Sequence, residues 1–289
     1  MDYQLISTVI LPIALGIIML GLGLSLTTDD FKRVVVFPKA VLIGLFCQMV
    51  LLPGVCYSVA MFFRLPPELA VGLMLLAASP GGATANLYSH LSKGDVVLNI
   101  TLTAVNSILS LFTLPFIVNF AMEAFMGEGR YIPLQFAKVV QIFVIVLGPV
   151  SIGMFIRSQA PQLAERFEKP VKIFSVLFLA FIIVVTFLSQ QKEFHTYFQV
   201  VGLAALTFNL LSMVTGYFVP LLFKIAKPQA IAIGMEIGIH NGTLAIAIAT
   251  SPLLLNNQTM SMPAVIYSLI MFVTAAVFGY LVNLKSNPS

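Results

Sequence analysis

Long runs of apolar residues, separated by short charged or proline-containing loops, dominate the sequence. A helix needs about 20 apolar residues to cross the hydrocarbon core of a bilayer. Of the 289 residues, 59% are hydrophobic and only 9% are charged, whereas soluble domains carry about 25% charged residues. We therefore expect an all-α membrane protein with about nine transmembrane helices, at residues 5–26, 38–62, 68–91, 94–122, 132–156, 170–190, 197–223, 229–252 and 261–283.

The basic residues predict how these spans are oriented, because cytoplasmic loops are enriched in Lys and Arg. With the N-terminus outside, the inner loops and tail hold 11 of the 15 basic residues. The outer side holds the other four, which are Arg64, Arg130, Lys138 and Lys192. We expect a multi-pass protein of the inner (plasma) membrane, with the N-terminus outside and the C-terminus in the cytoplasm. The basic residues are scattered through short loops, so no nucleic-acid partner is expected.

Two other features of the sequence have structural interpretations. The longest polar stretch, Arg157 to Lys172, is interpreted either as a cytoplasmic hinge between two halves of the chain or as a plain solvated loop. Cys47 and Cys56 both lie in apolar runs, without the spacing of a metal site or a disulfide framework. Both are expected to be small buried residues.

Two predicted spans, 68–91 and 229–252, carry polar and flexible residues at mid-membrane depth. These are the segments Ser79–Asn86 (SPGGATAN) and Glu236–Thr243 (EIGIHNGT). Pro80 lacks an amide hydrogen and two glycines follow it, which disfavours a continuous helix. Such breaks are tolerated in lipid only where they are buried or line a cavity. Paired breaks indicate a transporter's binding site, although kinks that ease helix packing would also explain them.

Glu236 is the acidic residue that lies deep in a predicted span; the other Asp and Glu residues lie in loops, at helix ends or in the N-terminal tail. A carboxylate at this depth is expensive and marks a functional site by default. Its own span offers no Lys or Arg, so it needs a cation, a proton or a distant partner. A site of oxygen ligands for a monovalent cation is one interpretation, and a protonated structural Glu is the other.

Further polar residues lie within other spans. Gln48 is in the middle of the second span, and the fourth carries polar residues along one helix face, at spacings of three, four and seven: Asn99, Thr103, Asn106 and Ser107. Hydrogen bonding between membrane helices would explain each of them alone. Together with two broken spans, they indicate oxygen ligands.

With these motifs, the chain resembles the bile acid:sodium symporter family over essentially its whole length. The most specific parts of the resemblance are Ser79-Pro80-Gly81-Gly82 with Asn86, Glu236-x-Gly238-x-x-Asn241, and Met19-x-Gly21-x-Gly23-Leu24. The resemblance implies an inverted-repeat transporter, with two crossing discontinuous helices in a core domain and a panel domain beside it. In one transporter unit, residues 1–289, the panel helices would be about 5–26 and 132–190, and the core helices about 38–122 and 197–283.

The resemblance also implies two sodium sites at the helix crossing. The first would involve Asn86, Asn99, Thr103 and Glu236. In the family a Ser often precedes the matching Asn, but Ala85 stands here, and its side chain cannot bind an ion.

The second implied site would use Gln48, Glu236 and backbone carbonyls near Ile237 and Ile239. Its last side-chain ligand is usually Gln in the family and is His240 here. A neutral His nitrogen is a poor ligand for a hard cation, and His titrates near neutral pH. The second site would then be weak, absent or replaced by proton linkage; if the ring instead bonds a neighbouring carbonyl, the site would survive.

We therefore expect sodium-coupled symport of an organic anion, bile acid-like or a small carboxylate, by alternating access. The anion would bind near Ala83, Thr84, Asn86 and Asn241, where half-helix N-termini offer amides and positive dipole ends. A proton-coupled or sodium-independent organic anion carrier of similar fold is the alternative. No cofactor is expected beyond sodium as coupling ion.

An enzyme, a channel and a higher oligomer are not expected. His90 and His195 lie near the membrane faces, far from Glu236 in the sequence, and neither has a metal-spaced partner. A lone central carboxylate between broken helices suits alternating access better than a channel. The expected partners are sodium ions, an organic anion and the lipid bilayer, and the expected state is a monomer.

Overall fold

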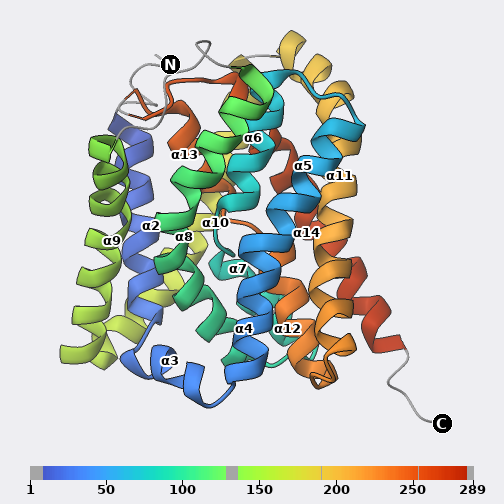
Figure 1. Ribbon diagram of the computed structural model, residues 1–289. Helices are drawn as coiled ribbons and strands as arrows, with labels where there is room; N and C mark the ends of the chain where they lie inside the picture. The colour runs from blue at the N-terminus through green and yellow to red at the C-terminus, as the bar shows by residue number, and fades with distance from the viewer. Residues whose placement is uncertain (1–8, 128–135, 190, 253, 285–289) are drawn as a thin grey trace.

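The computed structural model describes residues 9–127, 136–189, 191–252 and 254–284. These residues form a bundle of helices (Figure 1), and the one extended pairing among them is a single bridge between Gly81 and His240. The α-helices are α2 (Leu11–Ser25), α3 (Thr28–Lys32), α4 (Pro38–Phe46), α5 (Leu52–Phe62), α6 (Pro67–Ala78), α7 (Ala83–Leu91), α8 (Val96–Met126), α9 (Phe136–Gln159), α10 (Pro161–Ser189), α11 (Gln191–Leu222), α12 (Lys227–Gly238), α13 (Gly242–Thr250) and α14 (Met262–Leu284).

Among the described residues, four helices are long and apolar enough to cross a membrane: Pro38–Phe62, Val96–Met126, Phe194–Leu222 and Thr259–Leu284. A fifth span results if Pro12–Ser25 and Thr28–Val35, bent by 70° from one another, are taken as one. The predicted spans 68–91 and 229–252 are each divided into two half-helices, α6 with α7 and α12 with α13. The predicted span 132–156 begins outside the described residues, and the count of nine stays a prediction.

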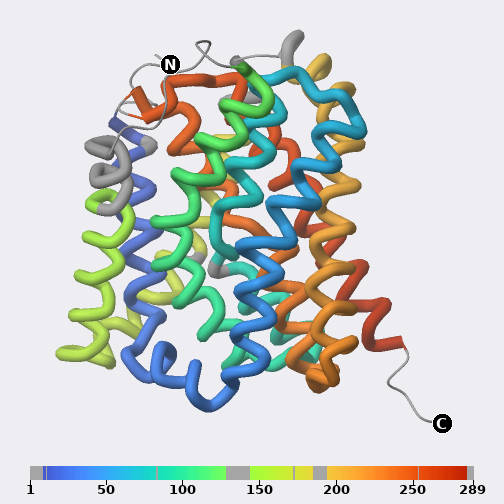
Figure 2. Tube along the Cα trace, viewed as in Figure 1, coloured from blue at the N-terminus to red at the C-terminus, as the bar shows by residue number. Residues whose placement is uncertain are grey.

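The helices fall into two groups that pack side by side. Helices α2, α9 and α10 contact one another on one side of the bundle, and the remaining long helices pack among themselves. The tube in Figure 2 shows that the α2–α4 connector, the α9–α10 junction and the α11–α12 turn lie at the same end. Helix α2 begins at the opposite end from the one where α14 ends. The predicted inner loops at these three places are thus on one side of the molecule.

Close packing of α2 depends on the glycines of its Met19-x-Gly21-x-Gly23 motif. A Cβ on Gly23 would collide with the backbone of Val150 in α9, and one on Gly21 would collide with the side chain of Val171 in α10. From the α9 side, Gly153 is equally close to the α2 backbone. Small residues allow this close approach, which drives helix association in lipid.

The outward faces of the bundle are apolar. Large hydrophobic side chains are exposed along several helices, with Phe62 at 81%, Phe116 at 76% and Leu222 at 79% exposure. In water such a surface would be a liability, but a bilayer accepts it. Cys47 and Cys56, in contrast, are fully buried and unpaired in the core, which confirms their prediction as buried residues.

Of the two interpretations of the stretch from Arg157 to Lys172, the plain solvated loop was wrong, and the hinge stays a prediction. Helix α9 continues to Gln159 and α10 begins at Pro161, so Ala160 alone separates them. Arg157 holds this junction through ion pairs with Glu165 at 3.6 Å and Glu168 at 3.7 Å. The sequence suggested a loop because the first turns of α10 are charged, but charged residues are good helix formers outside the lipid.

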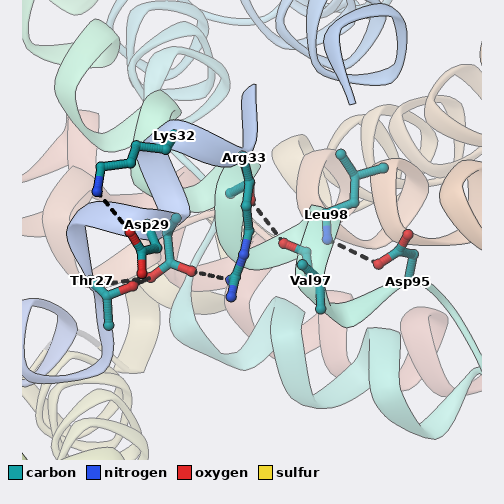
Figure 3. A network of polar contacts seen from close by, with 9 residues as sticks. Thr27, Asp29, Lys32, Arg33, Asp95, Val97 and Leu98 are labelled. Carbon is teal, nitrogen blue, oxygen red and sulfur yellow. Dashed lines mark hydrogen bonds and ion pairs between the residues drawn. The ribbon is translucent and has the colours of Figure 1, made fainter. Parts of the chain in front are cut away.

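A buried carboxylate organises the connector between α2 and α4, which contacts the start of α8. The Asp30 carboxylate accepts from the Thr27 amide at 2.6 Å and from the Thr27 hydroxyl at 2.8 Å, and it pairs with Arg33. Figure 3 shows this region next to Asp95, which accepts from the Leu98 amide at 3.0 Å and so caps α8. The connector is therefore a defined turn of helix and joins the two helix groups.

We expect Asp30→Ala to lower the melting temperature of the detergent-purified protein by about 2–6 °C, because losing a capping carboxylate costs about 0.5–2 kcal/mol. Asp29→Ala is the matched control. Asp29 pairs with Lys32 at 2.9 Å, but both side chains are largely exposed, and such pairs contribute little. Equal shifts for the two variants in a thermal-unfolding assay would contradict this role of Asp30.

Candidate functional site

The two breaks meet at the centre of the bundle. Helix α6 ends at Ala78 and α7 begins at Ala83, while α12 ends at Gly238 and α13 begins at Gly242. The Gly82 amide donates to the Ile239 carbonyl at 3.0 Å, and the Asn241 amide donates to the Pro80 carbonyl at 2.9 Å. Each break thus satisfies the backbone of the other, which is what a break in a membrane requires. We call this pair of segments, 79–82 and 239–241, the crossing.

Glu236 lies in the last turn of α12 and is completely buried. Its Oε2 accepts from the Thr103 hydroxyl at 2.6 Å, and its Oε1 accepts from the Asn106 amide at 3.3 Å, both from α8. The backbone of Gly81 also lies directly against this carboxylate. A Cβ on Gly81 would overlap the carboxylate, so glycine is required there. The hydrogen-bond partners described for Glu236 are therefore neutral donors from distant parts of the chain. They include no basic side chain.

Several amide oxygens on α7 and α8, the helices that pack against α12, have no hydrogen-bond partner within the described part of the chain. These buried atoms are Asn86 Oδ1 from α7 and both Asn99 Oδ1 and Asn106 Oδ1 from α8. Asn99 is held in place because its Nδ2 donates to the Ala232 carbonyl of α12 at 2.7 Å. Buried acceptors without donors are costly. Neutral oxygens beside a carboxylate are the ligand type of hard cations.

The other polar residues predicted in α8 differ in role. Ser107 donates to the Thr103 carbonyl of its own helix at 2.7 Å. Asn106 was recognised as part of the polar face but was not included among the predicted sodium ligands, although it bonds the carboxylate directly. Ala85, at the position where the family often has Ser, is fully buried and offers no oxygen from its side chain.

Gln48 and His240 share a different partner at the crossing. Gln48 Nε2 donates to the carbonyls of Ala77 at 3.2 Å and Ser79 at 3.1 Å. His240 Nδ1 is 3.2 Å from the same Ser79 carbonyl. The ring of His240 stacks on Phe208 and also contacts Tyr267, with centroid separations of 5.8 Å and 5.5 Å. The structure thus brings these two predicted ligands together at one carbonyl.

Gln48 is positioned by a turn that the sequence analysis did not foresee. Residues Cys47–Leu51 form one π-helical turn between α4 and α5. Pro53 follows in the first turn of α5, and its missing amide hydrogen removes one bond of the regular helix. Such π turns recur at functional sites.

Two further residues at the crossing were missed. The Gly238 carbonyl accepts from Asn209 Nδ2 and from the Tyr267 hydroxyl, each at 2.9 Å. Asn209 in turn accepts from the hydroxyl of Thr274. The signal was available for Asn209, because an Asn in the middle of an apolar span needs a partner just as Gln48 does. Nothing in the sequence distinguishes Tyr267 from other aromatic residues of α14.

The backbone carbonyls that were predicted as ligands also lie here. Ile239 is in the crossing, where its carbonyl accepts the Gly82 amide. Ile237 is fully buried in the last turn of α12, next to Glu236.

A cavity of about 350 Å³ borders the crossing. One wall is formed by the two breaks and the starts of α7 and α13, and the opposite wall by α2 and α10. Thr84 and Asn241, both predicted to bind substrate, line it, as do Gly81 and Gly82. The remaining lining is mostly apolar, and the described lining residues include no Lys or Arg.

The other predicted substrate residues are placed differently. Ala83 is the first residue of α7, and its side chain lies outside the described part. Asn86 is one turn further along α7, and the structure does not bring it to the cavity wall as described. Asn241 also caps α13, because its Oδ1 accepts from the Leu244 amide at 3.0 Å.

Comparison with known proteins identifies the kind of protein that carries this site. Residues 12–197 match the model of the Sodium Bile acid symporter family. The chain is 28% identical over 243 residues to an uncharacterized sodium-dependent transporter of Bacillus subtilis, covering 83% of this chain and 74% of that protein. It is 29% identical over 173 residues to a probable chloroplastic sodium/metabolite cotransporter of rice, covering 60% of this chain and 40% of that protein.

A third relative is the P3 protein of mouse, which is 27% identical over 234 residues, covering 78% of this chain. The chain spans about half the length of that protein, 47%, and 40% of the rice one. The family model covers more than half of the chain, and the family's members are transporters and not enzymes. The chain, with its crossed half-helices and buried carboxylate, belongs to the Sodium Bile acid symporter family.

Proposed function

We propose that this protein is a secondary active transporter that couples the entry of sodium to the uptake of an organic anion by alternating access. The observation that carries the proposal is the position of Gly81. Gly81 lies directly against the Glu236 carboxylate, and the same residue lines the 350 Å³ cavity. A cation bound at Glu236 and an anion bound in the cavity would therefore act on the same few backbone atoms.

Sodium binds beside Glu236 in this scheme, with Asn86, Asn99 and Thr103 as further ligands. The unpartnered amide oxygens of Asn86 and Asn99 support this site, because a cation would satisfy acceptors that no protein donor reaches. The ion neutralises a carboxylate that is costly at this depth. It also ties α7, α8 and α12 to one another and so fixes the crossing.

The organic anion binds in the cavity, near Thr84 and Asn241 and the first turn of α7 at Ala83. The N-termini of α7 and α13 both begin at this wall, and helix N-termini favour anions through their free amides and dipole. The apolar lining suits an anion with a hydrophobic body, such as a bile acid-like molecule or a small carboxylate.

Alternating access requires one group of helices to move against the other. We assign α2, α9 and α10 to a panel domain and the other long helices to a core domain, because each group packs mainly within itself and the cavity lies between them. Rocking of the panel against the core would open the cavity to either side. We further propose that the protein resides in the inner membrane with its N-terminus outside.

Two isosteric variants of α8 test the cation site. We expect Thr103→Val to raise the sodium concentration for half-maximal uptake by at least about tenfold, because Val removes one of the proposed ligand oxygens and the interaction of a polar group with a charge contributes about 1.5–3 kcal/mol. The matched control is Thr101→Val: Thr101 is equally buried, but its hydroxyl donates only to the Val97 carbonyl of its own helix. Uptake of a radiolabelled organic anion into proteoliposomes, titrated with sodium, gives both values.

The control variant should stay within about twofold of the wild type. If Thr103→Val shows the same sodium dependence as Thr101→Val, the cation does not bind at Glu236. The labelled anion is chosen beforehand by a thermal-shift screen of organic anions with and without sodium. An anion that stabilises the protein only with sodium present is the expected hit.

A further inference from the structure

The polar groups at the crossing form two sets with opposite hydrogen-bonding character. The first, which we call the carboxylate side, contains Glu236 and the unpartnered oxygens of Asn86, Asn99 and Asn106. The second, which we call the histidine side, contains His240 with the residues around its ring: Gln48, Ser79, Phe208 and Tyr267. The carboxylate side therefore offers acceptors that no donor reaches in the described residues.

On the histidine side, the protein's own donors already reach the backbone carbonyls. The Ser79 carbonyl faces both Gln48 Nε2 and His240 Nδ1. A carbonyl can only accept, so the contact with His240 requires the hydrogen to be on Nδ1. Two N–H groups thus direct their positive ends at this one carbonyl oxygen.

Neighbouring carbonyls are satisfied in the same way. The Gly238 carbonyl accepts from both Asn209 and Tyr267, and the Ile239 carbonyl accepts from the Gly82 amide. The Glu236 carboxylate already accepts from Thr103 and Asn106 of α8, one donor at each oxygen. A cation placed here would have to share this one carboxylate with both donors and with the ion on the carboxylate side, and a buried charge that is only partly compensated is unfavourable.

The polar atoms that have no hydrogen-bond partner on the histidine side suit ligands other than a hard cation. His240 Nε2 is buried without a partner in the described residues, but in the neutral ring it is a nitrogen lone pair, which sodium disfavours. Gln48 Oε1 is also unpartnered, and Gln48 lines a cavity of about 10 Å³ together with Asn106. That is about the room of one water molecule, whose two O–H groups would match the two amide oxygens.

We infer that this protein carries a single sodium ion per transport cycle, because His240 and Gln48 provide from within the protein the positive groups that a second ion would supply. The inference rests on the proposed function. It differs from the two ions that the resemblance to the family implies, and it makes the uptake of a monocarboxylate electroneutral. One cation and one anion enter together and move no net charge.

Equilibrium binding of ²²Na⁺ to the purified protein tests the number of ions directly. We expect one ion per polypeptide for the wild type and a hyperbolic sodium dependence of uptake. His240→Gln replaces the ring with a side chain that carries a carbonyl oxygen. This variant should therefore bind two ions per polypeptide. Its uptake should depend on sodium sigmoidally, with a Hill coefficient that rises from about 1 toward 2. Thr101→Val should keep one ion.

A second measurement uses the membrane potential. An interior-negative potassium diffusion potential, imposed with valinomycin, should leave wild-type uptake of a monocarboxylate unchanged and should stimulate uptake by His240→Gln. Two sodium ions bound to the wild type, or potential-driven wild-type uptake, would overturn the inference and leave sodium symport intact. The absence of any sodium binding would overturn the proposed function itself, and this inference with it. A His240→Gln variant that folds but still binds one ion would overturn the role given to His240.

Discussion

Glu236→Gln is expected to reduce sodium-driven uptake to background and to weaken sodium binding about a thousandfold. The substitution keeps the size and shape of the side chain and removes one negative charge. At about 4 Å and an effective dielectric constant near 20, that charge attracts a bound cation by about 4 kcal/mol, which corresponds to nearly three factors of ten in affinity. ²²Na⁺ binding and sodium-dependent uptake measure the two effects separately.

The fold should survive this substitution. The amide oxygen of Gln can still accept from Thr103 or from Asn106, whose donors now face the carboxylate. A neutral residue at this depth also avoids the cost of a buried charge, so the melting temperature without sodium should not fall. The variant should lose the stabilisation by sodium that the wild type shows. Sodium-stimulated uptake retained in Glu236→Gln would exclude this carboxylate as the coupling group.

Gly81→Ala is expected to abolish uptake and sodium binding together. The added Cβ would overlap the Glu236 carboxylate, and neither group can easily move, because Gly81 is paired with His240 across the crossing. Overpacking in a rigid core costs about 1–3 kcal/mol or more. Here we expect that cost as a lower melting temperature accompanied by complete loss of transport.

Gly54→Ala provides the matched control. Gly54 is in α5, and a Cβ there would meet no atom within 4 Å. Replacing a helical Gly by Ala then tends to stabilise the helix slightly. The control should transport like the wild type and melt at the same temperature or higher. Normal transport by Gly81→Ala would mean that the close contact between the crossing and the carboxylate has no role in coupling.

The sequence was most informative about where the chain departs from regular helix. Pro80 with its two glycines, and the Glu236–Thr243 segment, predicted two interruptions, and α6 and α12 end there. These signals are local, because the geometry of proline and glycine does not depend on distant partners. Glu236 could be selected in the same way, since a carboxylate within an apolar span is conspicuous on composition alone.

Contacts between distant segments could not be predicted from such local signals, and only the resemblance to the family implied that α8 meets Glu236. The face of α8 with Asn99 and Thr103 was recognised, but its orientation toward Glu236 depends on how α8 and α12 pack. Pairing of Gly82 with Ile239 is a backbone interaction and leaves no mark in the side chains. The π-helical turn at Gln48 also escaped prediction, because a proline one turn later normally indicates only a kink.

Polarity alone misled the prediction at one place. The charged stretch from Arg157 was interpreted as a hinge or a loop, whereas α9 and α10 are helical on both sides of Ala160. Helices that extend beyond the bilayer carry charged residues freely, so hydropathy marks the edge of the lipid and not the end of the helix.

The most direct test of the account is gradient-driven accumulation in proteoliposomes that contain the purified protein. An inward sodium gradient should concentrate a labelled organic anion inside the vesicles above its external concentration. Potassium or choline in place of sodium should abolish this accumulation, and Glu236→Gln should show none under any condition. Accumulation that follows an inward proton gradient and ignores sodium would contradict sodium coupling at Glu236.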